Sequence, residues 1–258
     1  MMPENSLKNK LREGRPVIGV FIITSHPTIA EVLALSGFDW LVFDMEHGVI
    51  DLESVEMMAQ AISRTDTSAL VRVPWNDFVV IKQVLDTGVQ GLIIPMVNTP
   101  QQAQQAVKAT RYPPQGIRGI GPHRASGFGI WINQYFERAD ENITVIIQIE
   151  HKEAVENLEK ILEVKGIDCV FIGANDLAAS MGLLGNPGHP EVENTIQYIN
   201  TVCKKSGVPC GLVASSSQID QRINEGFQFI VAGTDISLLR NGCESIFSEV
   251  KSISRRLG

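Results

Sequence analysis

The chain has 258 residues, of which 44% are hydrophobic and 20% are charged. This composition excludes a mostly disordered protein, and the length suits one large domain with its own core. Lys and Arg number 22 and Asp and Glu 29, for a formal net charge of −7. With no basic cluster in the sequence, we do not expect a nucleic-acid partner.

The apolar segments are too short to predict a membrane or a secretory role. Residues Val17 to Ile23 fall short of a signal-peptide core, and no run reaches a membrane-spanning length. The four cysteines form neither a CxxC pair nor a zinc-finger spacing, which favours buried thiols in a reducing compartment. We therefore expect a soluble cytoplasmic protein with no membrane partner.

Eight short runs, rich in Val and Ile and apolar at consecutive positions, are typical of parallel strands buried on both faces. They are Pro16–Thr24, Trp40–Asp44, Ala69–Val73, Gly91–Val97, Thr144–Glu150, Cys169–Gly173, Pro209–Ala214 and Phe229–Ala232. The first run lacks the GxGxxG that an open, doubly wound nucleotide-binding sheet would require after it.

The segments between these runs have helical periodicity. The predicted helices are Leu52–Ser63, Asp77–Thr87, Pro100–Thr110, Lys152–Val164, Glu191–Lys205, Ser216–Glu225 and Ser237–Leu257. Strands alternating with helices over this length predict an α/β fold, a closed (β/α)8 TIM barrel occupying residues 1–258 as a single domain. The segment Tyr112–Asn142 holds five glycines and is predicted to be a long functional loop.

A barrel of this kind carries its active site at the carboxyl ends of its strands. Glu150 and Asp176 end two neighbouring predicted strands. Their carboxylates suit a hard divalent cation such as Mg²⁺, Mn²⁺ or Co²⁺. The alternative is that both acids cap the helices that follow.

His47 and Arg72 also fall at predicted strand ends. His47 is the best candidate for proton transfer, and Asp44, three residues before it, would orient its ring. A buried Arg72 needs an anionic partner, which is either a structural salt bridge to Glu46 or a substrate oxyanion.

The other histidines favour structural roles. His26 and His189 each precede a proline in a predicted loop, and His151 is expected to pack away from the site. No lysine falls inside a predicted strand, and Lys152 is the only near miss. Imine chemistry is therefore disfavoured, because it needs a desolvated lysine in the barrel, and metal-assisted chemistry is favoured.

Eight sequence motifs occur in an order that resembles the HpcH/HpaI aldolase family. They are FDMEHG, VRVPWND, LIIPMV, RYPPQGIRGIG, HRASGFG, VIIQIE, FIGANDLAASMG and GNPGHPEV. The resemblance runs from about Arg15 to Arg240. It implies a class II, divalent-metal-dependent pyruvate aldolase similar to 4-hydroxy-2-oxoheptanedioate aldolase or 5-keto-4-deoxy-glucarate aldolase.

The resemblance also implies a role for each matching residue. His47 matches the catalytic base, and Arg72 the group that stabilises the enolate. Two further acids are implied to raise the basicity of the histidine. The implied assignments are Glu150 and Asp176 as metal ligands, Gln148, Asn175 and Asp176 as substrate contacts, and Asp86 and Asp44 as the two further acids. Asn175 departs from the Ala or Ser that the family often has at this position.

The glycine-rich loop around Gly121 resembles that of the sugar-acid aldolases more than that of the heptanedioate aldolases. Because Arg124 lies in this loop, we expect it to bind a distal carboxylate of the substrate. The expected reaction is the reversible cleavage of a 4-hydroxy-2-oxo acid to pyruvate and an aldehyde of the semialdehyde or tartronate-semialdehyde type. The alternatives are a CoA-thioester lyase of the related citrate-lyase branch and a non-catalytic protein that binds sugar acids.

The resemblance further implies a homo-oligomer, a hexamer built as a trimer of dimers in which C-terminal helices are exchanged between subunits. The predicted helix Ser237–Leu257 has an apolar face that must pack on something. The alternative is that this face packs on the barrel of its own chain.

Overall fold

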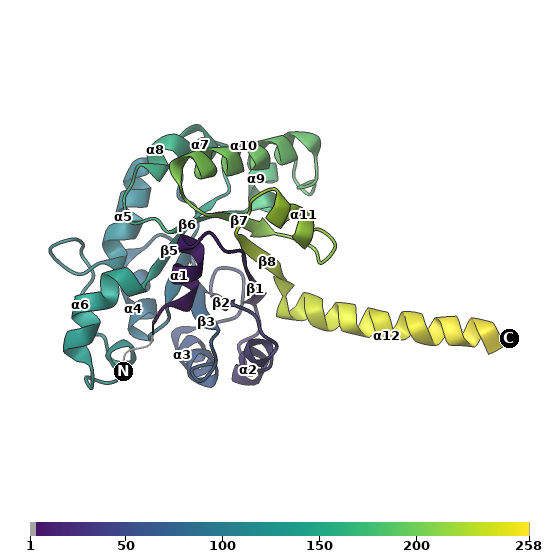
Figure 1. Cartoon of the computed structure of the whole chain (residues 1–258), viewed down its shortest axis with the longest axis horizontal. Helices are drawn as coiled ribbons and strands as arrows, with labels where there is room; N and C mark the ends of the chain where they lie inside the picture. Colours follow the sequence, from purple (N-terminus) through teal and green to yellow (C-terminus); the bar gives the residue numbers. More distant parts are fainter. Residues whose placement is uncertain (1–3, 258) are drawn as a thin grey trace.

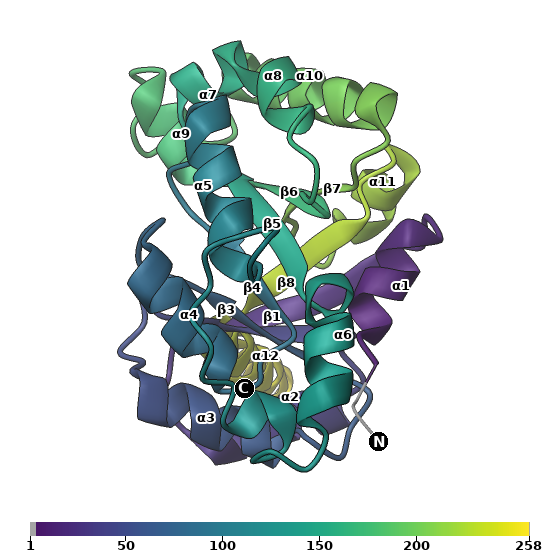
Figure 2. The same cartoon turned by 90° about the vertical axis from the view of Figure 1, so that its left-hand side faces the viewer.

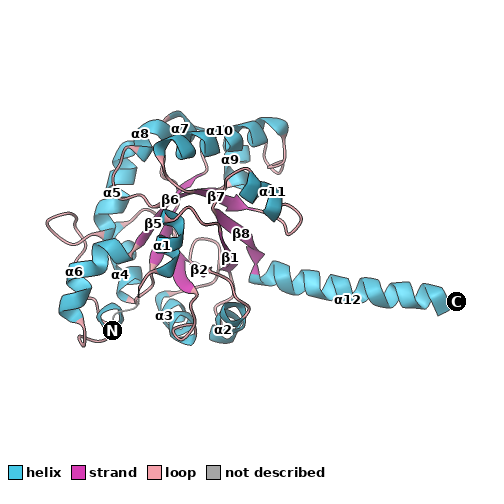
Figure 3. Ribbon diagram, viewed as in Figure 1, coloured by secondary structure: helices cyan, strands magenta, loops and turns pink. Residues whose placement is uncertain are grey.

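The computed structural model describes residues 4–257 and the side chains of residues 4–250. The chain forms a closed barrel of eight parallel strands, in which each strand pairs with the next and β8 pairs with β1 (Figure 1, Figure 3). The strands are β1 (Val17–Ile22), β2 (Trp40–Asp44), β3 (Ser68–Arg72), β4 (Gly91–Ile94), β5 (Thr144–Ile149), β6 (Cys169–Ile172), β7 (Cys210–Val213) and β8 (Phe229–Thr234). The prediction of a (β/α)8 barrel is confirmed.

Helices surround the barrel on its outside. They are α1 (Ser6–Arg12), α2 (Pro27–Leu35), α3 (Leu52–Ala61), α4 (Phe78–Asp86), α5 (Pro100–Thr110), α6 (Ile132–Asn142), α7 (Lys152–Glu156), α8 (Leu158–Leu162), α9 (Ala174–Ser180), α10 (Pro190–Ser206), α11 (Ile219–Asn224) and α12 (Asp235–Leu257), with a 3-10 turn η1 (Arg124–Ser126). Helices α1, α2, α6 and α9 are not among the predicted ranges, and the single helix predicted over Lys152–Val164 is divided at Asn157.

Two apolar cores account for the continuous apolar runs of the strands. One lies between the sheet and the surrounding helices, and the other fills the barrel itself. Inside the barrel the Trp40 ring stacks on Phe229, with ring centroids 4.1 Å apart. Every strand except β7 contributes residues to both cores, so its side chains are buried on both faces. The residues of β7 in these cores, Cys210 and Leu212, belong to the outer one.

Helix α1 closes the amino-terminal end of the barrel. Leu7 and Leu11 are buried in the interior core, and the Lys8 Nζ atom lies 2.9 Å from Asp168 Oδ2. Burial lowers the pKa of Lys8, although the charge of Asp168 opposes the shift. Figure 2 shows α1 beside α6, and the Asn5 N–H donates to Asn142 Oδ1 across this contact at 3.2 Å.

The prediction of one long loop over Tyr112–Asn142 is wrong in its second half, where η1 and α6 form. The apolar residues of α6, which are Ile132, Tyr135, Phe136 and Ala139, recur at helical spacing, so the sequence carried a signal for this helix that the loop prediction overlooked. The packing expected for His151 is also wrong. Its Nδ1 atom accepts the Glu153 N–H at 3.2 Å and caps α7, and His26 and His189 cap α2 and α10 in the same way.

Helix α12 extends away from the barrel over 23 residues (Figure 1). Leu238 packs against the outer core near the start of the helix, but Leu239 and Phe247 further along are each 66% exposed. Packing of the apolar face on its own barrel is therefore not what the structure shows. Among residues 4–257, no helix is both long enough and apolar enough to cross a membrane.

We predict that Gly19→Ala lowers the free energy of unfolding by about 3 kcal/mol or more, because added carbon overfills a packed barrel. A Cβ at this position would lie 2.2 Å from both the Trp40 ring and the Trp40 carbonyl oxygen. Urea denaturation followed by circular dichroism measures the change.

Gly188→Ala is the matched control, since a Cβ there would have no atom within 4 Å. Its unfolding free energy should stay within about 0.5 kcal/mol of the wild-type value. Equal stability of the two variants would contradict the close contact between β1 and β2.

Candidate active site

A bidentate ion pair joins the carboxyl ends of β2 and β3. The parallel register sets Asp44 directly beside Arg72. The Arg72 Nε atom donates to Asp44 Oδ1 at 2.8 Å, and Nη2 donates to Oδ2 at 2.6 Å. The two side chains are only 12% and 2% exposed. Two parallel charge-assisted hydrogen bonds in a buried setting fix the plane of the guanidinium.

Asp44 also shapes the loop that carries His47. Its Oδ1 atom accepts the backbone N–H groups of Glu46 at 3.1 Å and His47 at 3.4 Å. The expectation that Asp44 orients the imidazole ring therefore needs correction, because this carboxylate binds Arg72 and the backbone of the loop. Asp44 positions His47 through the main chain, and the imidazole itself is 64% exposed at the barrel mouth.

Glu46 lies between Arg72 and His47, and the salt bridge to Arg72 that the sequence offered as one alternative is present. Glu46 was not predicted to be a catalytic, substrate-binding or metal-binding residue. Its Oε2 atom is 3.2 Å from Arg72 Nε and 3.9 Å from His47 Nε2, and it is buried without a hydrogen-bond partner. Burial raises the pKa of Glu46 to about 7, helped by the charges of Glu150 and other carboxylates and opposed by Arg72. Glu46 is thus a second contact of Arg72, after Asp44.

Burial lowers the pKa of Arg72, but the hydrogen bonds to Asp44 and the charges of Asp44 and Glu46 outweigh it, so that the net direction is upward. The guanidinium carbon also lies 4.8 Å from the centre of the Phe21 ring. Arg72 therefore stays a fixed positive charge at the barrel mouth.

Glu150 follows β5 and is held by neighbours on two sides. Its Oε1 atom accepts the Met96 N–H at 2.7 Å, and its Oε2 atom accepts a hydrogen bond from the Gln148 side-chain amide. Met96 has a φ of 54°, an uncommon conformation for a residue other than glycine. A Cβ on Gly173 would lie 2.9 Å from Glu150 Oε2, so this glycine makes room for the carboxylate.

Asn175 and Asp176 lie in the first turn of α9, after β6, and both are exposed. The charge of Asp176 raises the pKa values of Glu46 and Glu150, after burial as the main cause for each. The alternative that Glu150 caps a helix is wrong, since Glu150 binds Met96 and Gln148 and the cap of α7 is His151.

The donor chemistry of this cluster fits a divalent cation. Glu150 and Asp176 supply carboxylate oxygens, and the Gln148 Oε1 atom is buried without a hydrogen-bond partner. Oxygen donors of this kind suit Mg²⁺ and similar ions. Within residues 4–257, no three His, Cys, Asp or Glu side chains together form a metal-binding group. The chain would thus supply two carboxylates and leave other positions to water or substrate.

Two predicted site residues lie elsewhere in the chain. Asp86 is the last residue of α4, which leads back to the amino-terminal end of β4, and its Oδ1 atom accepts a hydrogen bond from Arg118 at 2.9 Å. Arg124 donates to the carbonyl oxygens of Thr87 and Ala59. Within one chain, neither residue lies near His47. The carboxyl ends of the helices lead back to the amino-terminal ends of the strands, whereas His47 follows the carboxyl end of a strand, at the opposite end of the barrel.

Carboxylates, a fixed guanidinium and an imidazole at the strand ends of a (β/α)8 barrel are typical of a barrel enzyme with an acidic mouth. The chain belongs to the HpcH/HpaI aldolase/citrate lyase family, whose sequence model matches residues 17–242. The predicted family is confirmed, and the protein is a carbon–carbon lyase of the aldolase type.

Two aldolases and one solved structure show how similar the relatives are. The 4-hydroxy-2-oxo-heptane-1,7-dioate aldolase of Escherichia coli is 44% identical over 246 residues, 94% of each chain. The 5-keto-4-deoxy-D-glucarate aldolase of Citrobacter koseri is 40% identical over 249 residues, 96% of each chain. A structure of an HpcH/HpaI aldolase/citrate lyase family protein from Burkholderia cenocepacia J2315 is 35% identical, with a TM-score of 0.92 over 96% of this chain and 99% of that one.

The pKa of Glu46 predicts a pH dependence of stability in the metal-free protein. Because the pKa of about 7 in the folded state exceeds the ordinary glutamate pKa of 4.5, the folded state binds the proton more tightly. The contribution of Glu46 to the free energy of unfolding is therefore greatest below pH 4.5 and is lost as the pH rises through 7.

Urea unfolding in EDTA at a series of pH values compares wild type with Glu46→Gln. We expect the variant to gain stability relative to wild type as the pH rises towards 7. Glu53→Gln, at an exposed position of α3, is the control and should follow the wild-type curve. A constant difference between Glu46→Gln and wild type would contradict the burial of this carboxyl group.

Proposed function

We propose that the protein cleaves a 4-hydroxy-2-oxo acid reversibly to pyruvate and an aldehyde, with a divalent metal ion held by Glu150 and Asp176. The observation that carries this proposal is the fixed Arg72 guanidinium beside a carboxylate pair at one barrel mouth. The aldolase names of relatives that are 40% and 44% identical support it.

A divalent cation, when bound, would polarise the 2-oxo group of the substrate as a Lewis acid. The Glu150 carboxylate is pre-organised as a metal ligand, because hydrogen bonds from the Met96 N–H and the Gln148 side-chain amide hold its two oxygens in place. Gln148 has its own oxygen unpartnered, and we assign it, with Asn175 and Asp176, to contact with the substrate. The oxygen donors leave open the choice among Mg²⁺, Mn²⁺ and Co²⁺.

Arg72 stabilises the negative charge that develops when the carbon–carbon bond breaks. In the cleavage, the electrons of the C3–C4 bond pass to the pyruvate enolate, and the 4-hydroxyl group becomes the aldehyde carbonyl. The two hydrogen bonds to Asp44 use two N–H groups of the Arg72 guanidinium and leave the others free to donate to an enolate oxygen. Because Asp44 fixes the guanidinium beforehand, no reorganisation is needed during the reaction.

His47 takes the proton of the 4-hydroxyl group, directly or through a water molecule. Its exposure at the mouth gives it access to substrate, and Glu46 Oε2 at 3.9 Å from Nε2 favours the imidazolium that forms. Asp44 assists by holding the backbone of the loop on which His47 stands.

We further propose that the protein acts as a homo-oligomer, a hexamer of paired subunits, with α12 as an exchanged element. The exposed apolar residues of α12 support this assembly. Asp86, which the resemblance assigns to His47, would reach an imidazole only from a neighbouring subunit, because in its own chain it lies at the far end of the barrel and binds Arg118.

The proposed activity is tested by following pyruvate release with lactate dehydrogenase. The substrates are racemic 4-hydroxy-2-oxoheptanedioate and 5-keto-4-deoxy-glucarate, assayed in EDTA and then with added Mg²⁺, Mn²⁺ or Co²⁺. We expect release that disappears in EDTA and returns with metal, and that Glu150→Gln abolishes.

Glu153→Gln is the matched control, because Glu153 is an exposed acid in the first turn of α7. It should retain wild-type release. No release from either substrate by metal-loaded enzyme would contradict the proposal and direct the search to CoA thioesters, with acetyl-CoA binding as the assay. Release that is unchanged in EDTA would contradict the metal.

Arg72→Lys should lower kcat by about 100-fold to 1,000-fold, because one ammonium group cannot make both hydrogen bonds to Asp44 and also donate to the enolate. Steady-state kinetics with the better substrate measures the change, and KM should move far less than kcat. Arg138→Lys, at an exposed site on α6, is the control. An unchanged kcat in Arg72→Lys would exclude Arg72 from enolate stabilisation.

A further inference from the structure

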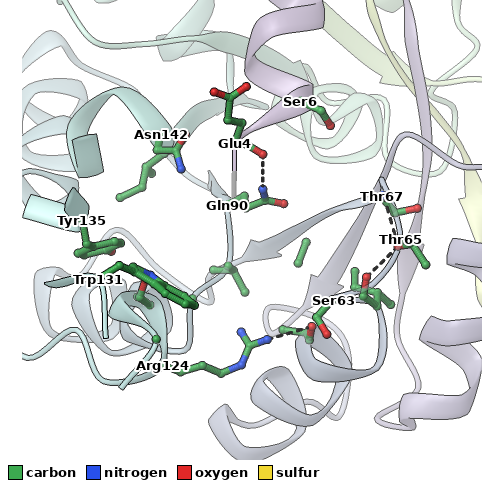
Figure 4. Close-up of a pocket in the computed structure, with 18 of the residues that line it drawn as sticks. Glu4, Ser6, Ser63, Thr65, Thr67, Gln90, Arg124, Trp131, Tyr135 and Asn142 are labelled. Carbon is green, nitrogen blue, oxygen red and sulfur yellow. Dashed lines mark hydrogen bonds between the residues drawn. The ribbon is translucent and has the colours of Figure 1, made fainter. Parts of the chain in front are cut away.

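The cavity drawn in Figure 4 has a volume of about 820 Å³. Its lining places it at the end of the barrel opposite the catalytic residues. It opens where β3 and β4 begin, at Thr67 and Gln90, whereas Arg72 and Met96 stand at the other ends of these strands. The end of α3, the start of α1 and the segment from η1 to α6 complete its walls. Its volume is in the range of sites that bind small molecules.

One side of the cavity is apolar and aromatic. Ile62, Ala69 and Val89 line it and are buried. The Trp131 indole and the Tyr135 ring form one wall, and Figure 4 shows the indole between Tyr135 and the Arg124 side chain. A flat apolar group could lie against the indole and exclude water from this surface.

Arg124 places a positive charge beside this surface. Its Nη1 atom donates to the Thr87 carbonyl at 2.7 Å and its Nη2 atom to the Ala59 carbonyl at 3.2 Å. These two bonds leave further N–H groups of the five on a guanidinium. Among the described residues, no carboxylate oxygen lies within 4.0 Å of Arg124, unlike Arg72, Arg118 and Arg222.

Burial lowers the pKa of Arg124, and the charge of Glu56 opposes the shift. A half-buried guanidinium that is hydrogen-bonded only to neutral carbonyl groups is stabilised more by a bound carboxylate than a guanidinium that already has an acidic partner. This charge and the aromatic wall are therefore complementary to one ligand that carries an acid group on an apolar body.

The other charges at the cavity restrict the ligand to a single negative charge. Glu4 and Asp66 line the opening and would repel a dianion or a phosphate. Lys10, the other cation of the lining, is already paired with Asp39 at 2.6 Å. Phe128 stands at the rim with a φ of 55° and a side chain that is 72% exposed, and it adds apolar surface at the opening.

We propose that this cavity is a second ligand site, specific for a small organic monocarboxylate with a flat apolar body. The carboxylate binds Arg124 and the flat group lies against Trp131. Within one chain the site is separate from the catalytic mouth, and binding to it does not depend on the proposed reaction.

Phenylacetate is the probe, and its uncharged analogue phenylacetamide is the matched control. Isothermal titration calorimetry with the full-length protein, in EDTA and in an excess of pyruvate, measures binding away from the catalytic site. We expect saturable binding of phenylacetate with a Kd of about 1 mM or tighter, and binding of phenylacetamide that is at least roughly tenfold weaker.

Two variants locate the binding. Arg124→Gln should weaken phenylacetate binding by roughly tenfold or more, because it removes the charge. Arg124 also holds the ends of two helices, so Ser63→Trp is a second variant, in which a bulky group at an exposed position of the lining fills the cavity. It should abolish binding while pyruvate release is retained.

Absence of saturable phenylacetate binding would overturn the proposal. So would equal binding of phenylacetate and phenylacetamide, displacement by pyruvate, or wild-type affinity in Ser63→Trp. A stable complex of two or more chains that excludes phenylacetate until it is dissociated would assign the cavity to subunit contact instead and would also overturn it.

Discussion

The ion pair between Asp44 and Arg72 is the interaction on which the candidate active site depends. It exists because β2 and β3 pair in parallel, with the carboxylate and the guanidinium directly beside each other in the register. The same carboxylate accepts the backbone N–H groups of Glu46 and His47. One buried acid therefore fixes both the cation assigned to the enolate and the loop that carries the base.

The two ends of the barrel have different physical characters. At the carboxyl ends of the strands, Glu46 and Glu150 are buried acids whose pKa values are raised, and the charges of neighbouring acids contribute to both shifts. Such a cluster is costly without a cation, which is why it is typical of a site built for one. At the other end, Leu7, Leu11 and Lys8 of α1 close the interior of the barrel and stabilise it.

The sequence was sufficient to predict the barrel and much of its mouth. Strands such as β5 are buried on both faces, and their continuous apolar runs predict them directly. Once eight strands are placed, a residue such as Glu150 at a strand end is assigned to the mouth by topology alone. The family motifs add roles to these positions, and those roles stay predictions until variants are measured.

Other features were not predicted, for identifiable physical reasons. Helix α6 has Ile132, Tyr135, Phe136 and Ala139 at helical spacing, but the glycine-rich stretch before it favoured a loop over the whole segment. The motif that contains Arg124 was assigned to the mouth, but the guanidinium binds the ends of α3 and α4, a contact that no local pattern encodes. The contact of Glu46 with Arg72 was one of two alternatives predicted for that arginine, whereas the position of Glu46 between Arg72 and His47 is determined by the fold.

Anomalous diffraction from crystals of the protein soaked with Mn²⁺ and oxalate, an analogue of the pyruvate enolate, is the most direct test of this account. We expect one strong anomalous peak between the carboxylates of Glu150 and Asp176, with oxalate bound beside it and facing an Arg72 that is still paired with Asp44. A peak at another place, or an Arg72 side chain turned away from the oxalate, would contradict the assignment of the active site.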